Sequence, residues 1–229
     1  MGGLNVKNTI AERALQIIAP HPCYGCGKMG NVLCDYCKYD IIHEPFVGCI
    51  LCGRPNLEGA CQYHASPFRR VYTVSTRAGT LKHIIDGLKF SHNKSAAKAL
   101  ADLLHDSLPL FPAGTIIVPI PTIPSHIRTR GYDHVGVIAQ HLSSLRGMPI
   151  APLLIRRTRT VQHAASNATA RRNQAETAFA IKDSDIEGRS VLVLDDIVTT
   201  GSTLVAAGRL LQEAGAYVYG AALAYQPLD

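Results

Sequence analysis

The stretch Val191–Leu204, VLVLDDIVTTGSTL, decides the fold of this chain. It begins with four apolar residues, continues through the adjacent carboxylates Asp195 and Asp196, and ends in hydroxyl-rich residues around Gly201. The apolar run is typical of a buried parallel strand. Residues 202–216 carry leucine and alanine at helical spacing, so we expect a helix directly after the strand.

The turn between this strand and helix suits a phosphate group, because free backbone N–H groups and the helix dipole both favour an anion. The residues of the turn are Thr199, Thr200, Gly201, Ser202 and Thr203. Asp195 and Asp196 suit the adjoining ribose, since carboxylates accept hydrogen bonds from vicinal hydroxyls. An ordinary strand end and helix N-cap is the alternative, but it leaves two adjacent carboxylates without partners, which is costly. The segment therefore predicts a ribose 5-phosphate site.

This segment resembles the 5-phosphoribosyl-1-pyrophosphate (PRPP) binding motif of type I phosphoribosyltransferases, which has two acidic residues, two spacer positions and then Thr-Thr/Ser-Gly. The resemblance implies an α/β fold with a parallel sheet flanked by helices. It also implies PRPP as the ligand of Asp195, Asp196 and residues 199–203. Mg²⁺ is implied with it, because a hard cation bridges pyrophosphate and ribose oxygens.

Length and composition allow one medium domain and one small domain, since the chain has 229 residues and 47% hydrophobic content. The first 22 residues are predicted to form a short amphipathic helix rather than a secretory signal or membrane span. The chain is therefore expected to be cytoplasmic. Its formal net charge of +6 points mildly to anionic partners.

All seven cysteines lie between Cys23 and Cys61, in pairs whose members are separated by two residues. A histidine completes the fourth pair. In a cytosolic chain such pairs indicate metal rather than disulfides. The candidate ligands are Cys23, Cys26, Cys34, Cys37, Cys49, Cys52, Cys61 and His64. Because two pairs supply the four ligands of a tetrahedral Zn²⁺, the pattern predicts a zinc-binding double ribbon over residues 23–65.

The pairing of the four knuckles stays open. Sequential ribbons would use consecutive pairs, which the short spacers at Gly27–Leu33 and Gly53–Ala60 favour. A cross-brace would interleave the pairs, and one ion beside a degenerate site is a third arrangement. Eight candidate ligands for two sites leave no coordination position open, so the zinc is expected to be structural rather than catalytic.

Residues 66–229 form the second predicted domain, in which strands and helices alternate as in a parallel α/β sheet. Strands are expected at 71–76, 115–120, 191–194 and 217–225, and helices at 81–90, 94–108, 135–145 and after 201. The segments 121–134 and 156–177 are expected to be loops, the second of them long and flexible.

Arginine dominates the stretch between Asp106 and Glu176, which contains no lysine and Asp133 as its one acid. The arginines are Arg128, Arg130, Arg146, Arg156, Arg157, Arg159, Arg171 and Arg172. The planar guanidinium suits bidentate phosphate contacts, which indicates a pyrophosphate or a nucleic acid backbone as ligand. A solvated basic face is the alternative, and it carries more weight for Arg146 alone than for the group.

The order of the motifs resembles the ComF family, which includes ComFC and GntX-like proteins. The cysteine knuckles are followed by LKF at 88–90, VPIP at 118–121, RGY at 130–132, Gln162, RRN at 171–173, Phe179 and the PRPP motif. The resemblance implies a double zinc ribbon joined to a phosphoribosyltransferase-type domain. The family signature usually continues Asn-Gln after RGY, whereas this chain has Asp133-His134.

By this resemblance, the segment Pro121–Tyr132 binds pyrophosphate, with Arg128, Arg130 and Gly131 among its residues. Gln162 and Arg172 match a mobile loop that closes over the reaction centre. These assignments, like those of the PRPP and zinc ligands, are expectations carried over from the family to matching positions.

The resemblance implies a PRPP-binding competence protein that handles single-stranded DNA during natural transformation, when DNA enters the cytoplasm. Such a protein would work near the inner membrane with competence-machinery partners. Four tyrosines among the knuckles are suited either to stack on bases or to fill a small core around zinc: Tyr24, Tyr36, Tyr39 and Tyr63. The alternative function is an active Mg²⁺-dependent phosphoribosyltransferase acting on a base or another small acceptor. It is weakened because no evident element of the chain is left to read that acceptor.

Overall fold

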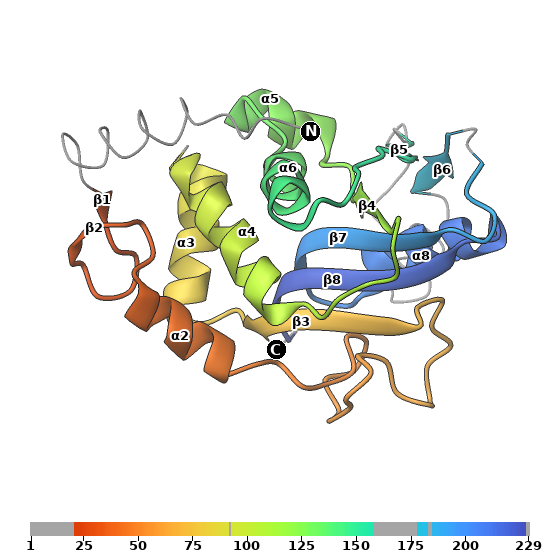
Figure 1. The fold of residues 1–229 in the computed structure, drawn as a ribbon, viewed down its shortest axis with the longest axis horizontal. Helices are drawn as coiled ribbons and strands as arrows, with labels where there is room; N and C mark the ends of the chain where they lie inside the picture. The colour runs from red at the N-terminus through yellow and green to blue at the C-terminus, as the bar shows by residue number, and fades with distance from the viewer. Residues whose placement is uncertain (1–20, 92, 158–177, 183–184, 228–229) are drawn as a thin grey trace, which may run out of the picture.

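A computed structural model describes residues 21–91, 93–157, 178–182 and 185–227. Within these residues, a four-stranded parallel sheet forms the centre of the molecule (Figure 1). In spatial order its strands are β3 (Arg70–Thr76), β8 (Tyr217–Tyr225), β7 (Ser190–Val198) and β4 (Ile116–Pro119). The predicted parallel α/β sheet is confirmed.

Alternate residues of each strand enter two hydrophobic cores on opposite faces of the sheet. Leu192 and Leu194 of β7 belong to the first core, whereas Val191 and Val193 belong to the second. This alternation follows from the period-two geometry of a strand. Both faces are apolar because helices cover both, which explains the unbroken apolar run of the sequence.

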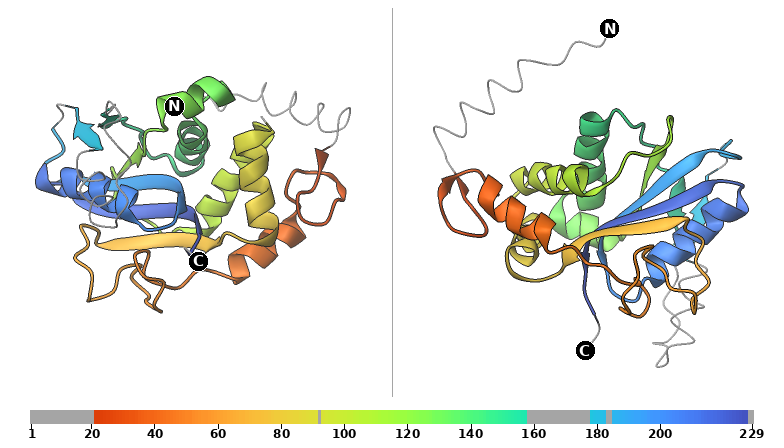
Figure 2. Two further views of the ribbon diagram at one scale, coloured as in Figure 1. Left: turned by 180° about the vertical axis from the view of Figure 1, so that it is seen from behind. Right: turned by 60° about the horizontal axis from the view of Figure 1, so that its bottom comes forward.

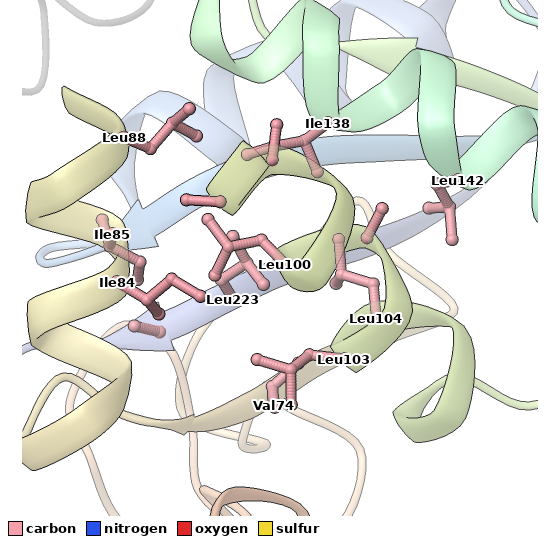
Figure 3. Packing of buried hydrophobic residues seen from close by; sticks show 14 of the residues in the cluster. Val74, Ile84, Ile85, Leu88, Leu100, Leu103, Leu104, Ile138, Leu142 and Leu223 are labelled. Atoms are coloured by element: carbon pink, nitrogen blue, oxygen red, sulfur yellow. The ribbon is translucent and has the colours of Figure 1, made fainter. Parts of the chain in front are cut away.

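Three helices cover the face of the first core: α3 (Gly79–Phe90), α4 (Ser95–Ser107) and α6 (His134–Arg146). Figure 3 shows their leucine and isoleucine side chains packing toward Val74 of β3 and Leu223 of β8. On the opposite face, α8 (Ser202–Glu213) packs against the second core, as the turned view of Figure 2 shows.

The cysteine region has little regular structure. The strands β1 (His21–Pro22) and β2 (Met29–Gly30) form a short antiparallel pair, and α2 (Asp35–His43) follows. No helix was predicted at α2, which has Cys34 of one knuckle as its N-cap and Cys37 in its first turn. After α2, an isolated antiparallel β-bridge joins Gly48 to Pro55, on either side of the knuckle Cys49–Cys52.

Two of the expected loops contain regular structure. The segment 121–134 includes the short helix α5 (Pro124–Arg130), so the loop prediction was wrong there. Pro124 lies at the start of this helix, where a fixed φ and a missing N–H are tolerated. The segment that begins at Arg156 starts in β5 (Leu154–Arg156), which pairs with β6 (Phe179–Ile181). None of the helices in the described ranges is long and apolar enough to cross a membrane.

Candidate functional site: a phosphate loop, a buried carboxylate pair and two cysteine clusters

The carboxyl ends of two neighbouring strands bring the predicted site residues together. β7 carries Asp195 and Asp196 and continues into the turn before α8. β4 lies beside β7 in parallel and leads into Pro121 and α5, which hold the predicted pyrophosphate residues. Because the carboxyl ends of parallel strands share one edge of the sheet, both segments reach the same place, where open α/β sheets bind ligands.

The turn between β7 and α8 has the features of a phosphate loop. Thr199 and Thr200 are exposed, and the Oγ1 atom of Thr200 lies 2.8 Å from Oγ of Ser202. Gly201 adopts the left-handed conformation with φ 68°, which turns the chain into the first turn of α8. That turn contains no acidic residue, and the N-terminus of a helix leaves backbone N–H groups without intrahelical partners. The N–H of Ser202 lies 3.4 Å from Oγ1 of Thr200.

Asp196 is the buried member of the carboxylate pair, with 7% of its surface exposed. Its Oδ2 atom lies 2.5 Å from Nζ of Lys89 and 2.7 Å from Nε2 of His134. Its Oδ1 atom accepts a hydrogen bond from the N–H of Ile197. Burial alone would raise the pKa of Asp196, but the bond from His134 and the charge of Lys89 hold that pKa far below its usual range. Asp196 is therefore a paired, ionised group.

Asp195 has the opposite electrostatic environment. Burial and the negative charge of Asp196 raise the pKa of Asp195 to about 8. Its Oδ1 atom accepts the N–H of Asp196, and its side chain is only partly covered. Adjacent carboxylates with pKa values driven apart are typical of functional sites.

His134 connects the carboxylate pair to the predicted pyrophosphate segment. Its Nδ1 atom lies 3.2 Å from a guanidinium nitrogen of Arg130. Because a guanidinium can only donate, Nδ1 accepts that bond and Nε2 carries the proton donated to Asp196. The Oγ1 atom of Thr122 donates to Asp133 and lies 3.4 Å from His134 Nδ1. Of the two residues that depart from the family signature, His134 thus links Arg130 of α5 to Asp196 of β7, and Asp133 binds Thr122.

The LKF and RGY motifs contact one another through two pairs of residues. The backbone carbonyl of Leu88 accepts a hydrogen bond from the hydroxyl of Tyr132. The guanidinium of Arg130 lies 5.6 Å from the ring centroid of Phe90, in a cation–π arrangement. Between these contacts, Lys89 extends to Asp196. The two motifs therefore form one structural unit beside the carboxylate pair.

The described arginines of the lysine-free stretch have different roles. Arg146 donates to the carbonyls of His105, Leu108 and Pro109 and so caps the end of α4, which excludes it from ligand binding. Arg156 donates to the carbonyl of Pro121 and interacts with the charge of Asp195, which places it at the site.

Of the other residues predicted to contact pyrophosphate or to form the mobile loop, some lie on α5 and the others lie outside the described residues. Arg128 is exposed on α5, and Gly131 ends that helix in the left-handed conformation with φ 77°. Gln162 and Arg172 lie outside the described residues. The structure therefore describes the predicted pyrophosphate segment, whereas the predicted lid lies outside the described residues.

The cysteine knuckles gather into two clusters, each made of consecutive pairs. The members of the first are Cys23, Cys26, Cys34 and Cys37, and those of the second are Cys49, Cys52, Cys61 and His64. Within each cluster all four ligand atoms lie within 4.8 Å of one another. The grouping is the sequential one.

Both clusters fit a tetrahedral zinc ion. Zn–S bonds of about 2.3 Å imply sulfur–sulfur distances of about 3.8 Å, and the structure has 3.7 Å between Cys26 and Cys34 and 3.8 Å between Cys52 and Cys61. Nδ1 of His64 lies 3.1 Å from the sulfur of Cys61, so the histidine completes the second set. Either cluster could hold a zinc ion.

The backbone favours a thiolate at one cysteine of each cluster, whereas burial raises the pKa of Cys37 to about 12. Although burial opposes it, the N–H of Cys34 helps to lower the pKa of Cys23 to about 6. Backbone hydrogen bonds in the second cluster likewise lower the pKa of Cys49 to about 6 against the effect of burial. Gly27 and Gly53 follow equivalent knuckles with φ near 70°, and each donates its N–H to the carbonyl four residues before it. Thiolates in such turns are the form that binds metal.

Sequence reasoning missed three contributors to the site. Lys89 lies on α3, far from β7 in the chain, and its motif was identified without a role. His134 was not among the predicted site residues, and Thr122 lies in the predicted pyrophosphate segment but was given no role of its own. No periodicity or spacing identifies such contacts, because they depend on how α3 and α6 pack against the sheet.

This combination of a phosphate loop, a strand-end carboxylate pair and a parallel sheet defines a phosphoribosyltransferase-type domain. Comparison with known proteins agrees, because the family model described as "Phosphoribosyl transferase domain" matches residues 127–228. Among solved structures, the adenine phosphoribosyltransferase of Leishmania tarentolae is similar with a TM-score of 0.38 and 20% identity, covering 62% of this chain and 74% of that one.

Similarity to curated proteins extends over most of the chain. The DNA utilization protein YhgH of Escherichia coli O157:H7 is 30% identical over 203 residues, covering 85% of this chain and 84% of that protein. Competence protein F of Haemophilus influenzae is 27% identical, with 81% and 86% covered. Competence protein ComFC of Bacillus subtilis is 26% identical, with 90% and 85% covered. The chain belongs to the ComF/YhgH family.

Proposed function

We propose that this chain is a PRPP-binding ComF-type competence protein that handles single-stranded DNA during natural transformation. The observation that carries the proposal is the family relation, which spans most of the chain and most of each relative. The relatives are named for DNA utilization and for competence. The phosphate loop and carboxylate pair support PRPP as the small-molecule ligand.

In this proposal each part of PRPP has its own group of residues. The 5-phosphate binds the loop Thr199–Thr203, where backbone N–H groups and hydroxyls converge. Asp195 accepts from a ribose hydroxyl, with Asp196 beside it, and Arg130 and Arg128 contact the pyrophosphate. Gln162 and Arg172 belong to the proposed lid. Mg²⁺ accompanies PRPP and neutralises the pyrophosphate oxygens.

Two structural zinc ions complete the proposed composition, one in each cysteine cluster. Neither cluster has a spare coordination position, because each already brings four ligand atoms together. Their role is therefore to hold the two ribbons in shape rather than to perform chemistry. Metal analysis of the purified protein tests this with an expected two zinc ions per chain.

The functional test is deletion in a naturally transformable host. If the deletion strain loses transformation but still binds DNA normally at the cell surface, the result supports a role in moving DNA into the cytoplasm. A complementing Asp195→Ala chain should fail to restore transformation. Unchanged transformation in the deletion strain would contradict the proposed role.

Single-stranded DNA binding is tested by its salt dependence. If basic side chains contact the phosphates, affinity should fall steeply as salt rises, since neutralised phosphates release counterions. Affinity that does not change with salt would contradict phosphate contact.

The second candidate function is an active phosphoribosyltransferase, which the described geometry of the carboxylates and phosphate loop favours. Pyrophosphate release discriminates between the two functions. The protein is incubated with PRPP, Mg²⁺ and a panel of bases. Binding of PRPP without release supports the binding protein, whereas release that depends on one base identifies an enzyme and its acceptor.

A further inference from the structure

The knuckle between Cys49 and Cys52 lies directly against the phosphate loop. A Cβ atom added at Gly201 would lie 2.9 Å from Cδ2 of Leu51 and 3.0 Å from the carbonyl oxygen of Ile50. The two loops are therefore in contact so close that even a methyl group does not fit between them. They are far apart in sequence, and nothing in either motif indicates this contact.

The knuckle is also fixed in the second core. Ile50 is 1% exposed and belongs to the same buried cluster as Val198, Leu204 and Val205, which flank the phosphate loop on both sides. The N–H of Ile50 donates to the carbonyl of Gly59 at 2.9 Å. The apolar residues between these two cysteines thus pack against the backbone of the phosphate loop.

A second contact fixes the other end of the knuckle. A Cβ atom added at Gly53 would lie 3.1 Å from the hydroxyl oxygen of Tyr225, the last residue of β8. The ring of Tyr225 stacks on Phe46 with 4.1 Å between ring centroids. The knuckle is therefore placed between the end of β8 and the start of α8.

The first cysteine cluster has different neighbours. Cys23, Cys37 and Leu33 are buried in the first core, on the face covered by α3 and α4. Tyr24, inside its first knuckle, packs against Gly87 of α3. The first cluster therefore joins the first core beside α3 and α4, whereas the knuckle of the second cluster joins the second core and contacts Gly201.

We propose that the second cysteine cluster positions the phosphate loop, with Ile50 and Leu51 as the positioning residues. The proposal rests on the proposed PRPP site. A metal ion bound by Cys49 and Cys52 would fix the two residues between them, and these hold Gly201 in its left-handed turn. Since coupling between two binding events is reciprocal, PRPP and the metal of the second cluster each increase the affinity of the other.

The first test compares Leu51→Ala with Leu57→Ala, two leucine truncations in the same ribbon. Leu57 is 75% exposed and serves as the control. PRPP affinity is measured by calorimetry, together with zinc content and melting temperature. Leu51→Ala should weaken PRPP binding by about five- to tenfold while both zinc ions are retained. Leu57→Ala should stay within about twofold of the wild type.

The second test uses the unmodified protein, so it does not depend on a variant that folds. Zinc is titrated with a competing chelator in the presence and absence of PRPP. One of the two ions should become harder to remove by about the same five- to tenfold factor, while the other is unaffected. In Leu51→Ala this protection should disappear.

The possible outcomes distinguish failure of the proposed coupling from failure of the proposed PRPP site. If the wild type binds PRPP but Leu51→Ala binds equally well, or if PRPP protects neither zinc ion, the coupling is overturned and the PRPP site stands. If the wild type binds no PRPP at all, the PRPP site is overturned and the coupling falls with it. Protection of both ions equally would indicate general stabilisation and would also overturn the proposal.

Discussion

Asp195 and Asp196 are adjacent in sequence but differ in their electrostatic roles. Asp196 is ionised and held by Lys89 and His134, whereas within the described residues no cation forms an ion pair with Asp195 at hydrogen-bonding distance. Buried charges require such partners because they have lost their hydration. Lys89 thus compensates the buried charge of Asp196 when no ligand is bound.

Replacement of Lys89 should be strongly destabilising. Lys89→Met leaves Asp196 buried with one partner fewer, at an expected cost of about 3 kcal/mol in the free energy of unfolding. Lys82→Met on the same helix is the matched control, because Lys82 is 48% exposed and its ion pair should contribute less than about 1 kcal/mol. Urea unfolding measures both variants. Equal losses in the two variants would contradict a special role for Lys89.

The raised pKa of Asp195 predicts a pH-dependent stability. Between the unfolded pKa, near 4, and the folded value of about 8, the unfolded state loses its proton while the folded state keeps it. Wild-type stability therefore falls as pH rises through this window, relative to Asp195→Asn, which does not titrate. The melting-temperature difference between variant and wild type should widen from pH 6 to pH 8 and level off above it. A constant difference over this range would show that Asp195 titrates normally.

At the scale of elements, α3 contributes to the site although it lies outside the strand ends that carry the carboxylates. Its last turn carries Lys89 and Phe90 toward the RGY segment, while its opposite side receives the first ribbon. Tyr24 packs so close to Gly87 that a Cβ there would lie 2.1 Å from the tyrosine oxygen, which also accepts a hydrogen bond from Asn93. The ribbon thus sets the position of the helix that carries Lys89.

This packing reverses the usual effect of a helical glycine. Gly87→Ala would ordinarily stabilise a helix by about 1 kcal/mol, but here it should destabilise the protein by about 1–2 kcal/mol because it displaces Tyr24. Thermal or urea unfolding gives the value. In the Tyr24→Ala background the same change should become neutral or stabilising. If Gly87→Ala costs as much with Tyr24 absent, the contact is not the cause.

The sequence was sufficient for elements that depend on local pattern. β8 runs over Tyr217–Tyr225 as predicted, and the strand-turn-helix around Gly201 has the expected form. It was insufficient for α5 and α2, since a proline-rich segment and a cysteine knuckle carry no helical periodicity. It was also insufficient for Lys89 and His134, because their roles arise from contacts between elements that packing alone brings together.

At the scale of the whole molecule, the two cysteine-rich ribbons contribute residues to the two different cores of the domain. The first shares a core with α3 and α4, and Ile50 of the second ribbon shares a core with α8. The proposed zinc ions would therefore stabilise the entire domain and not only the short ribbons, which contain little secondary structure of their own.

Removal of metal should accordingly lower the stability of the whole chain. Chelation is expected to reduce the melting temperature by about 10 °C or more, because structural zinc sites contribute several kcal/mol to folding. Differential scanning calorimetry with and without chelator measures the change, and added Zn²⁺ should reverse it. A melting temperature that is insensitive to a chelator shown to remove zinc would contradict this view.

The most direct test of the central claim is a calorimetric titration of PRPP, in the presence of Mg²⁺, into the wild type and Asp195→Ala. We expect saturable binding of one PRPP per chain to the wild type and none to Asp195→Ala, with zinc content equal in the two proteins. No binding to the wild type, or equal binding to both, would contradict the assignment of Val191–Leu204 as a PRPP site.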